Sequence, residues 1–372
     1  MTYTSATVQL LSQDGKLVES AASERYLPYL EALSEDQLRE FHREMAIIRR
    51  LDLEAANLQR QGQMGLWIPS VGQEAAQVGS GFAAKPQDHI FPAYREHAVA
   101  HIRGVDPLII IEMLRGLSHG GWDPKKNGNF HLYTLVIGSQ TLHATGYAMG
   151  IQLDGDTATG NPDTDEAVIV YFGDGASSQG DVSEALVFAA SYQTPEVFFL
   201  QNNHWAISVP VTRQSRTPLY LRASGFGIPG VQVDGNDVLA SYAVTRAHLD
   251  AARSGAGPQF IEALTYRIGA HTTSDDPTKY RDDAELDFWV KADPIPRFEA
   301  YLRGRGESDK FFSDVVQETE DFAADIRART FALGLPSNEK IFNHVYSEPH
   351  PLMRAQQQWL ADYEASFEGD QA

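Results

Sequence analysis

The sequence predicts an α/β fold in which helices flank a parallel sheet, and three observations support this class. Residues 167–172, 196–200 and 259–266 are short, rich in β-branched or aromatic side chains and not alternating with polar residues, which is typical of strands covered on both faces. The stretch 181–192 between the first two segments carries apolar residues at helical spacing. Strand, helix and strand in succession form a βαβ unit, and that unit requires a parallel sheet.

Helices are predicted on both sides of this sheet in the chain. Ser34 and Gln37 have the spacing of a capping box, and apolar residues recur every three or four positions from Leu38 to Leu58. Residues 237–253 are predicted to form another helix, and the pattern from 283 onward is helical, with fraying after 364. We divide the chain into an N-terminal extension and helix (1–54), an α/β domain (55–305) and a C-terminal helical region (306–372).

Composition excludes several classes of function. The chain of 372 residues has a formal net charge of -20, which argues against nucleic acid or an anionic membrane as a partner. It has no cysteine, so disulfides, thiolate metal sites and cysteine nucleophiles are excluded. The N-terminus has neither a signal peptide nor an Arg-rich leader, and the apolar run 108–111 is too short to cross a bilayer. These features predict a soluble cytoplasmic protein.

Polar residues follow two of the predicted strands at the points where the strands end. Gly173-Asp174-Gly175 follows the first strand, and Asn202-Asn203 follows the second. A tight turn would explain Asp174 alone but not Asn203. The carboxyl ends of neighbouring parallel strands share one crevice, where ligands and phosphates bind, and carboxylate and amide oxygens suit Mg²⁺. The sequence therefore predicts a cation and phosphate site at this edge.

These two motifs resemble the signature of thiamine diphosphate-dependent enzymes. Longer runs, "GDGASSQGDVSEAL", "QNNHWAIS", "YRIGAHTTSDDPTKYR" and "DPIPRF", resemble the alpha subunit of the decarboxylating component of 2-oxo acid dehydrogenase complexes, of the branched-chain or pyruvate type. The similarity runs from about residue 55 to residue 348. It implies a thiamine diphosphate-binding fold of the diphosphate-side type, with thiamine diphosphate and Mg²⁺ as cofactors.

Carried over residue by residue, the resemblance implies a set of binding residues. It makes Asp174, Asn203 and the carbonyl of Trp205 the Mg²⁺ ligands, and it makes Ile207 the support of the bent cofactor. The complete implied set of cofactor-binding residues is Tyr94, Arg95, Ser139, Gln140, Thr141, Asp174, Gly175, Ala176, Asn203, Trp205, Ala206, Ile207 and His271.

The resemblance also implies residues for substrate and chemistry. Tyr94, His131 and Ser139 match substrate-pocket positions, although the stretch "NGNFHLYTL" around His131 is shorter than usual. His271 matches a catalytic histidine that contacts the cofactor and assists acyl transfer to lipoamide.

Two departures from the family pattern leave questions open. Where some relatives bind a monovalent cation through a Thr-Gln pair, we align His143 and Ala144, so that site is in doubt. Gln201 stands where some relatives have an arginine, so diphosphate neutralisation is expected to depend on Arg95 and His271.

Partners and substrate follow from the same resemblance. A separate beta subunit is expected to complete the site, in an assembly of two alpha and two beta chains docked on a lipoyl acyltransferase core. We favour a branched-chain 2-oxo acid, 3-methyl-2-oxobutanoate, as substrate, in branched-chain amino acid catabolism, with pyruvate as the alternative. A more remote alternative is a nicotinamide-dependent oxidoreductase, because Gly79-Ser80-Gly81 fits a dinucleotide fingerprint by letters, although it continues a helical pattern instead of following a strand.

Overall fold

The computed structural model describes residues 4–335, 337–343 and 345–368 of the chain. Within these residues, five parallel strands form one sheet in the order β1-β2-β3-β7-β6. The strands are β1 (His89–Phe91), β2 (Val168–Gly173), β3 (Glu196–Asn202), β7 (Gln259–Leu264) and β6 (Gly230–Asp234). A short antiparallel pair, β4 (Trp205–Ala206) and β5 (Val209–Pro210), follows β3. The predicted parallel α/β class is confirmed.

Three of the strands were predicted, and two were not. β2, β3 and β7 begin and end within two residues of the predicted segments. β1 has only three residues and pairs with β2 on one side. On its other side the backbone of Ile90 bonds to the segment containing Asn129 and His131, at 3.0 and 2.8 Å. A strand this short depends on its neighbours and leaves no periodic signal.

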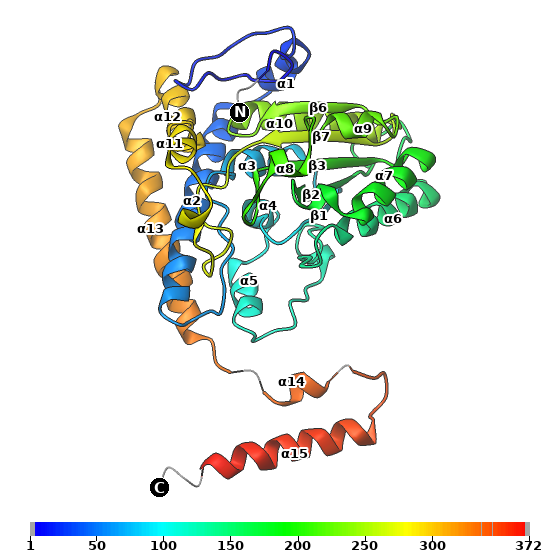
Figure 1. The fold of residues 1–372 in the computed structure, drawn as a ribbon, viewed down its shortest axis with the longest axis vertical. Helices are drawn as coiled ribbons and strands as arrows, with labels where there is room; N and C mark the ends of the chain where they lie inside the picture. Colours follow the sequence, from blue (N-terminus) through cyan, green and yellow to red (C-terminus); the bar gives the residue numbers. More distant parts are fainter. Residues whose placement is uncertain (1–3, 336, 344, 369–372) are drawn as a thin grey trace.

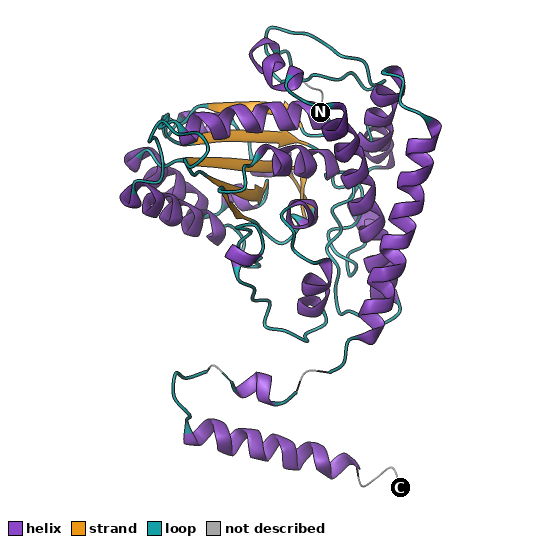
Figure 2. Ribbon diagram, turned by 180° about the vertical axis from the view of Figure 1, so that it is seen from behind, coloured by secondary structure: helices purple, strands orange, loops and turns teal. Residues whose placement is uncertain are grey.

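Helices cover both faces of the sheet (Figures 1 and 2). α6 (Ser139–Asp154) and α7 (Gly180–Tyr192) cover one face, where they pack on Val168, Val170 and Phe172 of β2. α3 (Glu74–Ala83) and α10 (Val238–Arg253) cover the other face, where they share a core with Ile169 and Tyr171 of β2. Successive residues of β2 therefore enter two separate cores, which explains why the strand is apolar throughout.

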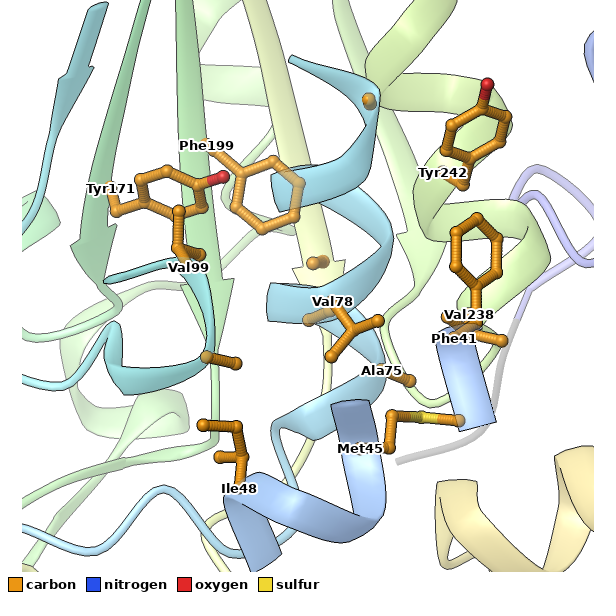
Figure 3. Close-up of a cluster of buried hydrophobic side chains, with 14 of the residues drawn as sticks. Phe41, Met45, Ile48, Ala75, Val78, Val99, Tyr171, Phe199, Val238 and Tyr242 are labelled. Carbon is orange, nitrogen blue, oxygen red and sulfur yellow. The ribbon is translucent and has the colours of Figure 1, made fainter. Parts of the chain in front are cut away.

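The long helix α2 (Glu35–Arg60) packs outside α3 and confirms the predicted capping box. The Ser34 side chain accepts from the backbone of Gln37, and the Gln37 side chain bonds back to Ser34. Figure 3 shows how Phe41, Met45 and Ile48 of α2 reach the same core as the side chains of α3, α4 (His97–Ile102), α10 and the sheet. The helix is therefore one layer of the α/β body.

The remaining helices surround this core. They are α1 (Leu27–Glu31), α5 (Pro107–Leu114), α8 (Val211–Gln214), α9 (Leu221–Ser224), α11 (Asp283–Lys291), α12 (Pro294–Gly304), α13 (Asp309–Ala332), α14 (Glu339–Phe342) and α15 (Pro351–Glu368). α13 lies along α2, whereas α14 and α15 extend away from the body (Figure 1). The helix α15 continues to residue 368, so the predicted fraying is wrong for residues 365–368, and the rest of that prediction lies outside the described residues. Among the described residues, no helix combines the length and apolar composition that a bilayer crossing requires.

The glycines at positions 79 and 81 lie inside α3 and not in a strand-to-helix turn. A Cβ on Gly79 would lie 2.7 Å from both the carbonyl oxygen of Val238 and the Cβ of Ser241 in α10. This glycine therefore allows α3 and α10 to pack closely. The dinucleotide fingerprint requires a turn that opens a helix after a strand, so the structure disfavours the nicotinamide alternative.

Candidate active site

A cavity of about 250 Å³ opens at the carboxyl ends of β1, β2 and β3. Eleven predicted site residues line it, namely Tyr94, Arg95, Gln140, Asp174, Gly175, Ala176, Asn203, Trp205, Ala206, Ile207 and His271. They come from the segments that follow β1, β2, β3 and β7 and from the first turn of α6. Parallel strands bring these separate segments to one edge, as the βαβ reading requires.

Asp174 lies at the end of β2, in a turn that depends on glycine. A Cβ on Gly175 would lie 2.8 Å from the Cβ of Ala206, so a larger residue would push β4 away from the turn. The Asp174 side chain is buried, and its Oδ2 accepts a hydrogen bond from Nε2 of Gln214 at 2.9 Å. Burial raises the pKa of Asp174 to about 6, although Gln214 and the backbone amides of Asp174 and Asn203 act in the opposite direction. The carboxylate therefore faces the cavity with little solvent to stabilise its charge.

Asn203 begins a segment whose backbone is strained. Its Nδ2 donates to Oε1 of Gln73 at 2.9 Å, and its Oδ1 accepts from the backbone of Trp205 at 3.2 Å. His204 and Ile207 have φ values of 71° and 54°, in the left-handed region that β-branched residues such as isoleucine rarely enter. A strained backbone persists only where the surrounding structure holds it in place, and such residues cluster at functional sites.

The cavity is bordered by cations that lack an anionic partner. Arg95 donates to the carbonyl of Pro69 and to both Nδ1 and the carbonyl of His271. Arg267 donates to the carbonyls of Trp205 and Ile207, at 3.0 and 2.7 Å. In the part of the chain that the structure describes, neither arginine forms an ion pair with a carboxylate. Both guanidinium groups therefore lie at the site without a carboxylate in direct contact.

The two titratable neighbours of Arg95 respond to this charge. Burial, followed by the charge of Arg95, lowers the pKa of Arg267 to about 10. Burial, followed by the charges of Arg95 and Arg267, lowers the pKa of His271 to about 4. A bound anion would raise the pKa values of Arg267 and His271 again, because it favours their protonated forms. The chemistry of these donors therefore suits an anionic ligand.

Three predicted residues do not line the cavity. Ser139 and Thr141 lie in the first turn of α6, where their hydroxyls donate to the carbonyls of Val136 and Gly138, at 2.9 and 2.7 Å. His131 lies behind β1, where its ring stacks on Phe91 with a centroid distance of 3.9 Å. Their roles toward cofactor and substrate stay predictions.

The cavity also contains polar residues that the sequence reasoning missed. Gln73 and Glu96 line it, and the Gln201 side chain, considered only as a missing arginine, donates to Glu96 Oε1 at 2.7 Å. Among the described residues, Nε2 of Gln73 and Oε1 of Gln201 are buried with no hydrogen-bond partner. Gln73 is the N-cap residue of α3, and Glu96 precedes α4. The one signal that the sequence offered for these two residues was a polar side chain at the start of a helix. Buried unpaired polar atoms of this kind mark a place where a ligand belongs.

The chain is similar to proteins of one family along most of its length. The family model described as "Dehydrogenase E1 component" matches residues 42–321. The chain is 43% identical over 356 residues to the 3-methyl-2-oxobutanoate dehydrogenase subunit alpha of Mycobacterium tuberculosis, covering 95% of this chain and 93% of that protein. It is 38% identical over 318 residues to the pyruvate dehydrogenase E1 component subunit alpha of Bacillus cereus, covering 85% and 81%. It is 37% identical over 352 residues to the protein of the same description from Acholeplasma laidlawii, covering 92% and 96%.

Proposed function

The chain belongs to the dehydrogenase E1 component family, and from this premise we propose that it is the alpha subunit of a branched-chain 2-oxo acid dehydrogenase that acts on 3-methyl-2-oxobutanoate. One observation carries the substrate: the identity is 43% over 95% of the chain to the relative described by that substrate, against 38% over 85% to a pyruvate relative. The family is thiamine diphosphate-dependent, and its alpha subunits work with a beta subunit in a larger complex.

Asp174, Asn203 and the Trp205 carbonyl are proposed to hold Mg²⁺. No group of three or more His, Asp or Glu side chains within the described residues is arranged to hold a metal, so the site depends on amide and carbonyl oxygens as well as one carboxylate. Oxygen donors of these kinds are the ones that Mg²⁺ prefers, with phosphate and water completing its shell. The Trp205 carbonyl already accepts from Arg267 at 3.0 Å, and a carbonyl oxygen has a second lone pair for a cation.

The cations around the cavity are proposed to hold the diphosphate. Arg95 lines the cavity directly, and Arg267 lies behind it, holding the carbonyls of the segment that ends at Ile207. The turn at Gly175 and Ala176 precedes the helix α7, where backbone amides favour an anion. Thiamine diphosphate, when bound, supplies the carbon centre and the electron sink that allow a 2-oxo acid to lose CO₂. This chain anchors its anionic end.

His271 is proposed to act on the acyl group as a neutral imidazole. Its Nδ1 faces two guanidinium donors, Arg95 at 3.2 Å and Arg267 at 3.5 Å, so Nδ1 accepts and the ring proton is held on Nε2. The backbone of His271 donates to Asp275 Oδ2 at 2.8 Å, which fixes the start of the loop. A neutral ring with a proton on Nε2 can donate a hydrogen bond to an oxygen of substrate or cofactor.

Replacing His271 with asparagine tests this role against that of a non-catalytic assembly subunit. If the histidine acts in acyl transfer, the reconstituted complex should lose acylation of a lipoyl domain by about 10²–10⁴-fold, the usual range for a positioned proton donor or acceptor. An assembly subunit would lose nothing.

A beta subunit is proposed to cover the open side of the cavity. The volume of about 250 Å³ is below the roughly 300–1,000 Å³ of a complete small-molecule site, as expected if a second chain supplies the remainder. Beside the cavity, Leu135 and Val136 are 60% and 71% exposed, which is costly for a monomer and suits a partner surface. We propose two alpha and two beta chains, docked on a lipoyl acyltransferase core.

Reconstitution tests the function and the partner together. The purified chain with thiamine diphosphate and Mg²⁺ should not decarboxylate 3-methyl-2-oxobutanoate, and the beta chain should restore turnover and acylation of a lipoyl domain. We expect kcat/KM to be at least about tenfold higher for 3-methyl-2-oxobutanoate than for pyruvate, because the branched substrate adds apolar groups to the bound state. A preference for pyruvate would overturn the substrate, and turnover by the chain alone would overturn the partner.

A further inference from the structure

Two glutamines contact the two side chains that we propose as cation ligands. Nε2 of Gln214 donates to Oδ2 of Asp174 at 2.9 Å, and Oε1 of Gln73 accepts from Nδ2 of Asn203 at 2.9 Å. Gln214 is 40 positions from Asp174 in the chain, and Gln73 is 130 positions from Asn203. Neither glutamine is part of the two motifs that carry the ligands, so the tertiary structure brings each one to its partner.

The backbone N–H of Trp205 decides which end of the Asn203 amide is the oxygen, and Gln73 accepts from the other end. A side-chain amide can turn by half a rotation and exchange its oxygen for its nitrogen, and only its partners distinguish the two states. Here Oδ1 accepts from the backbone of Trp205 at 3.2 Å while Nδ2 donates to Gln73. In the turned state, a nitrogen would face the Trp205 donor. Gln73 and Trp205 together therefore keep an oxygen, and not an N–H group, available to a cation.

Gln214 restrains the rotation of the Asp174 carboxylate. The terminal torsion of aspartate is soft, so a buried carboxylate without a partner can adopt several orientations. The hydrogen bond from Gln214 occupies Oδ2 and leaves Oδ1 for another ligand. Each proposed ligand side chain therefore has one oxygen that accepts a hydrogen bond: Oδ2 of Asp174 accepts from Gln214, and Oδ1 of Asn203 accepts from the backbone of Trp205.

Gln214 is itself held by a ring of hydrogen bonds that returns to Asp174. Arg222 donates to the carbonyl of Gln214 at 3.1 Å and to the hydroxyl of Ser177 at 2.9 Å. The Ser177 hydroxyl in turn donates to the carbonyl of Asp174 at 2.6 Å. The ring connects the turn after β2 to the segment 211–222, so the main chain at Gln214 is held beside Asp174 before any ligand arrives.

We propose that Gln73 and Gln214 are positioning residues, each of which orients one ligand oxygen, on Asn203 and Asp174 respectively, for the Mg²⁺ of the cofactor. The inference rests on the proposed function of this site. It assigns neither glutamine a direct contact with the metal. Outer-shell partners of this kind typically change metal affinity by about 10–100-fold when they are removed.

The test measures cation binding instead of turnover. In the full alpha and beta assembly, Mg²⁺ is titrated at a fixed concentration of thiamine diphosphate, and cofactor binding is followed by calorimetry. Gln73→Met and Gln214→Met remove the polar end at nearly constant length, and each should raise the half-saturating Mg²⁺ concentration by about 10-fold or more. Gln152→Met is the matched control, because within the described part of the chain the Gln152 side chain in α6 bonds only to the carbonyls of Tyr192 and Gln193. It should bind Mg²⁺ as the parent does.

A conservative variant separates orientation from packing. Gln73→Glu keeps an oxygen that accepts from Asn203, so it should bind Mg²⁺ more nearly like the parent than Gln73→Met does. Equal losses in the two Gln73 variants would overturn the acceptor role. Thermal unfolding without ligands is measured in parallel, and a methionine variant that unfolds at the parent temperature but needs more Mg²⁺ supports the proposal.

Asp174→Ala distinguishes failure of this inference from failure of the proposed function. If Asp174→Ala weakens Mg²⁺ binding while both methionine variants match the parent, the positioning role is wrong and the metal site stands. If Asp174→Ala also binds Mg²⁺ and thiamine diphosphate as the parent does, the metal assignment itself is wrong.

Discussion

At the amino-terminal edge of the sheet, Arg253 and Asp88 form an ion pair with side chains 3% and 0% exposed, whereas at the carboxyl-terminal edge Arg95 and Arg267 contact carbonyls and uncharged side chains. Both oxygens of the Asp88 carboxylate also accept hydrogen bonds from the backbone, of Lys85 and of Ala167, so the buried charge has partners on each oxygen. Guanidinium groups are buried at both edges, but beside the cavity none of the described carboxylates pairs with Arg95 or Arg267. Elsewhere at the carboxyl-terminal edge, Arg297 pairs with Asp234 at the end of β6, at 2.8 Å. Buried charge in these ion pairs stabilises the fold, whereas the buried charge beside the cavity is available to a ligand.

Unpaired polar atoms follow the same division. In the described residues, Gln73, Gln140, Gln201 and Trp205 line the cavity, and each has one buried side-chain atom without a hydrogen-bond partner. Other such atoms lie away from the cavity, on His42, Glu44, Ser241 and Thr245 among others. At the amino-terminal edge, Glu196 has one such oxygen, while its other oxygen accepts from Thr145 at 2.9 Å. Leaving a buried donor or acceptor unpaired costs free energy in the empty protein, and only the atoms in the cavity wall can gain a partner from a bound ligand.

The largest expected effect on stability comes from breaking the buried ion pair between Arg253 and Asp88. Arg253→Met should lower the free energy of unfolding by about 3–5 kcal/mol, because it leaves the Asp88 carboxylate buried without its cation. Urea unfolding of the purified chain measures this loss. The affinity for thiamine diphosphate, measured below the unfolding transition, should stay that of the parent; a matching loss of affinity would show that the two edges are not independent.

Replacing an arginine beside the cavity should weaken cofactor binding more clearly than it lowers stability. Arg95→Met leaves buried carbonyl and imidazole acceptors without a donor but no buried carboxylate without its cation, so the unfolding free energy should fall by about 1–3 kcal/mol, at or below the loss for Arg253→Met. Thiamine diphosphate binding in the alpha and beta assembly should weaken by about 1.5–3 kcal/mol, the range for a hydrogen bond to a charged group. Calorimetric titration checks this, and a large stability loss with unchanged affinity would contradict the comparison.

The third effect depends on pH and concerns Glu196. Burial raises the pKa of Glu196 to about 8, above the usual value of 4.5. The folded state then binds the proton more tightly than the unfolded state, so stability should be highest below about pH 4.5 and fall as the pH rises toward 8. Glu196→Gln imitates the protonated form, so its stability relative to the parent should increase as the pH rises toward 8.

Urea midpoints at pH 5, 6.5 and 8 follow this difference, and the advantage of the variant should grow across the series. A constant difference would mean that Glu196 is ionised throughout and that the amino-terminal edge tolerates an unpaired carboxylate.

Much of the fold was predictable because its signals are local. The capping box at Ser34 and the periodic apolar residues behind it predicted α2, and apolar runs predicted β2, β3 and β7. β1 and β6 were missed because strands of three and five residues are stabilised by pairing with neighbours and carry little pattern of their own. The fraying predicted after 364 was wrong for residues 365–368, because α15 continues to residue 368.

The site was predictable where function follows the end of a strand. Asp174 and Asn203 stand directly after predicted strands, so topology alone places them at one edge. Gln73 and Gln214 could not be found in this way, since their partners are 130 and 40 positions distant and a glutamine in a polar segment carries no signal. His131 was taken from the resemblance alone; its ring stacks on Phe91 and does not line the cavity, and its role toward substrate stays a prediction.

By itself, the sequence determined the parallel α/β class, the strands that end in polar ligands and the family to which the chain belongs, because each rests on runs of adjacent residues whose spacing sets their geometry. The tertiary structure decided which buried charges are paired. Arg253 meets Asp88 across 165 positions of the chain, while Arg95 meets His271 across 176 and forms no ion pair with a carboxylate of the described residues. Two arginines look alike in a sequence, and only the packing of distant segments determines whether the charge of each is neutralised within the protein or left for a ligand.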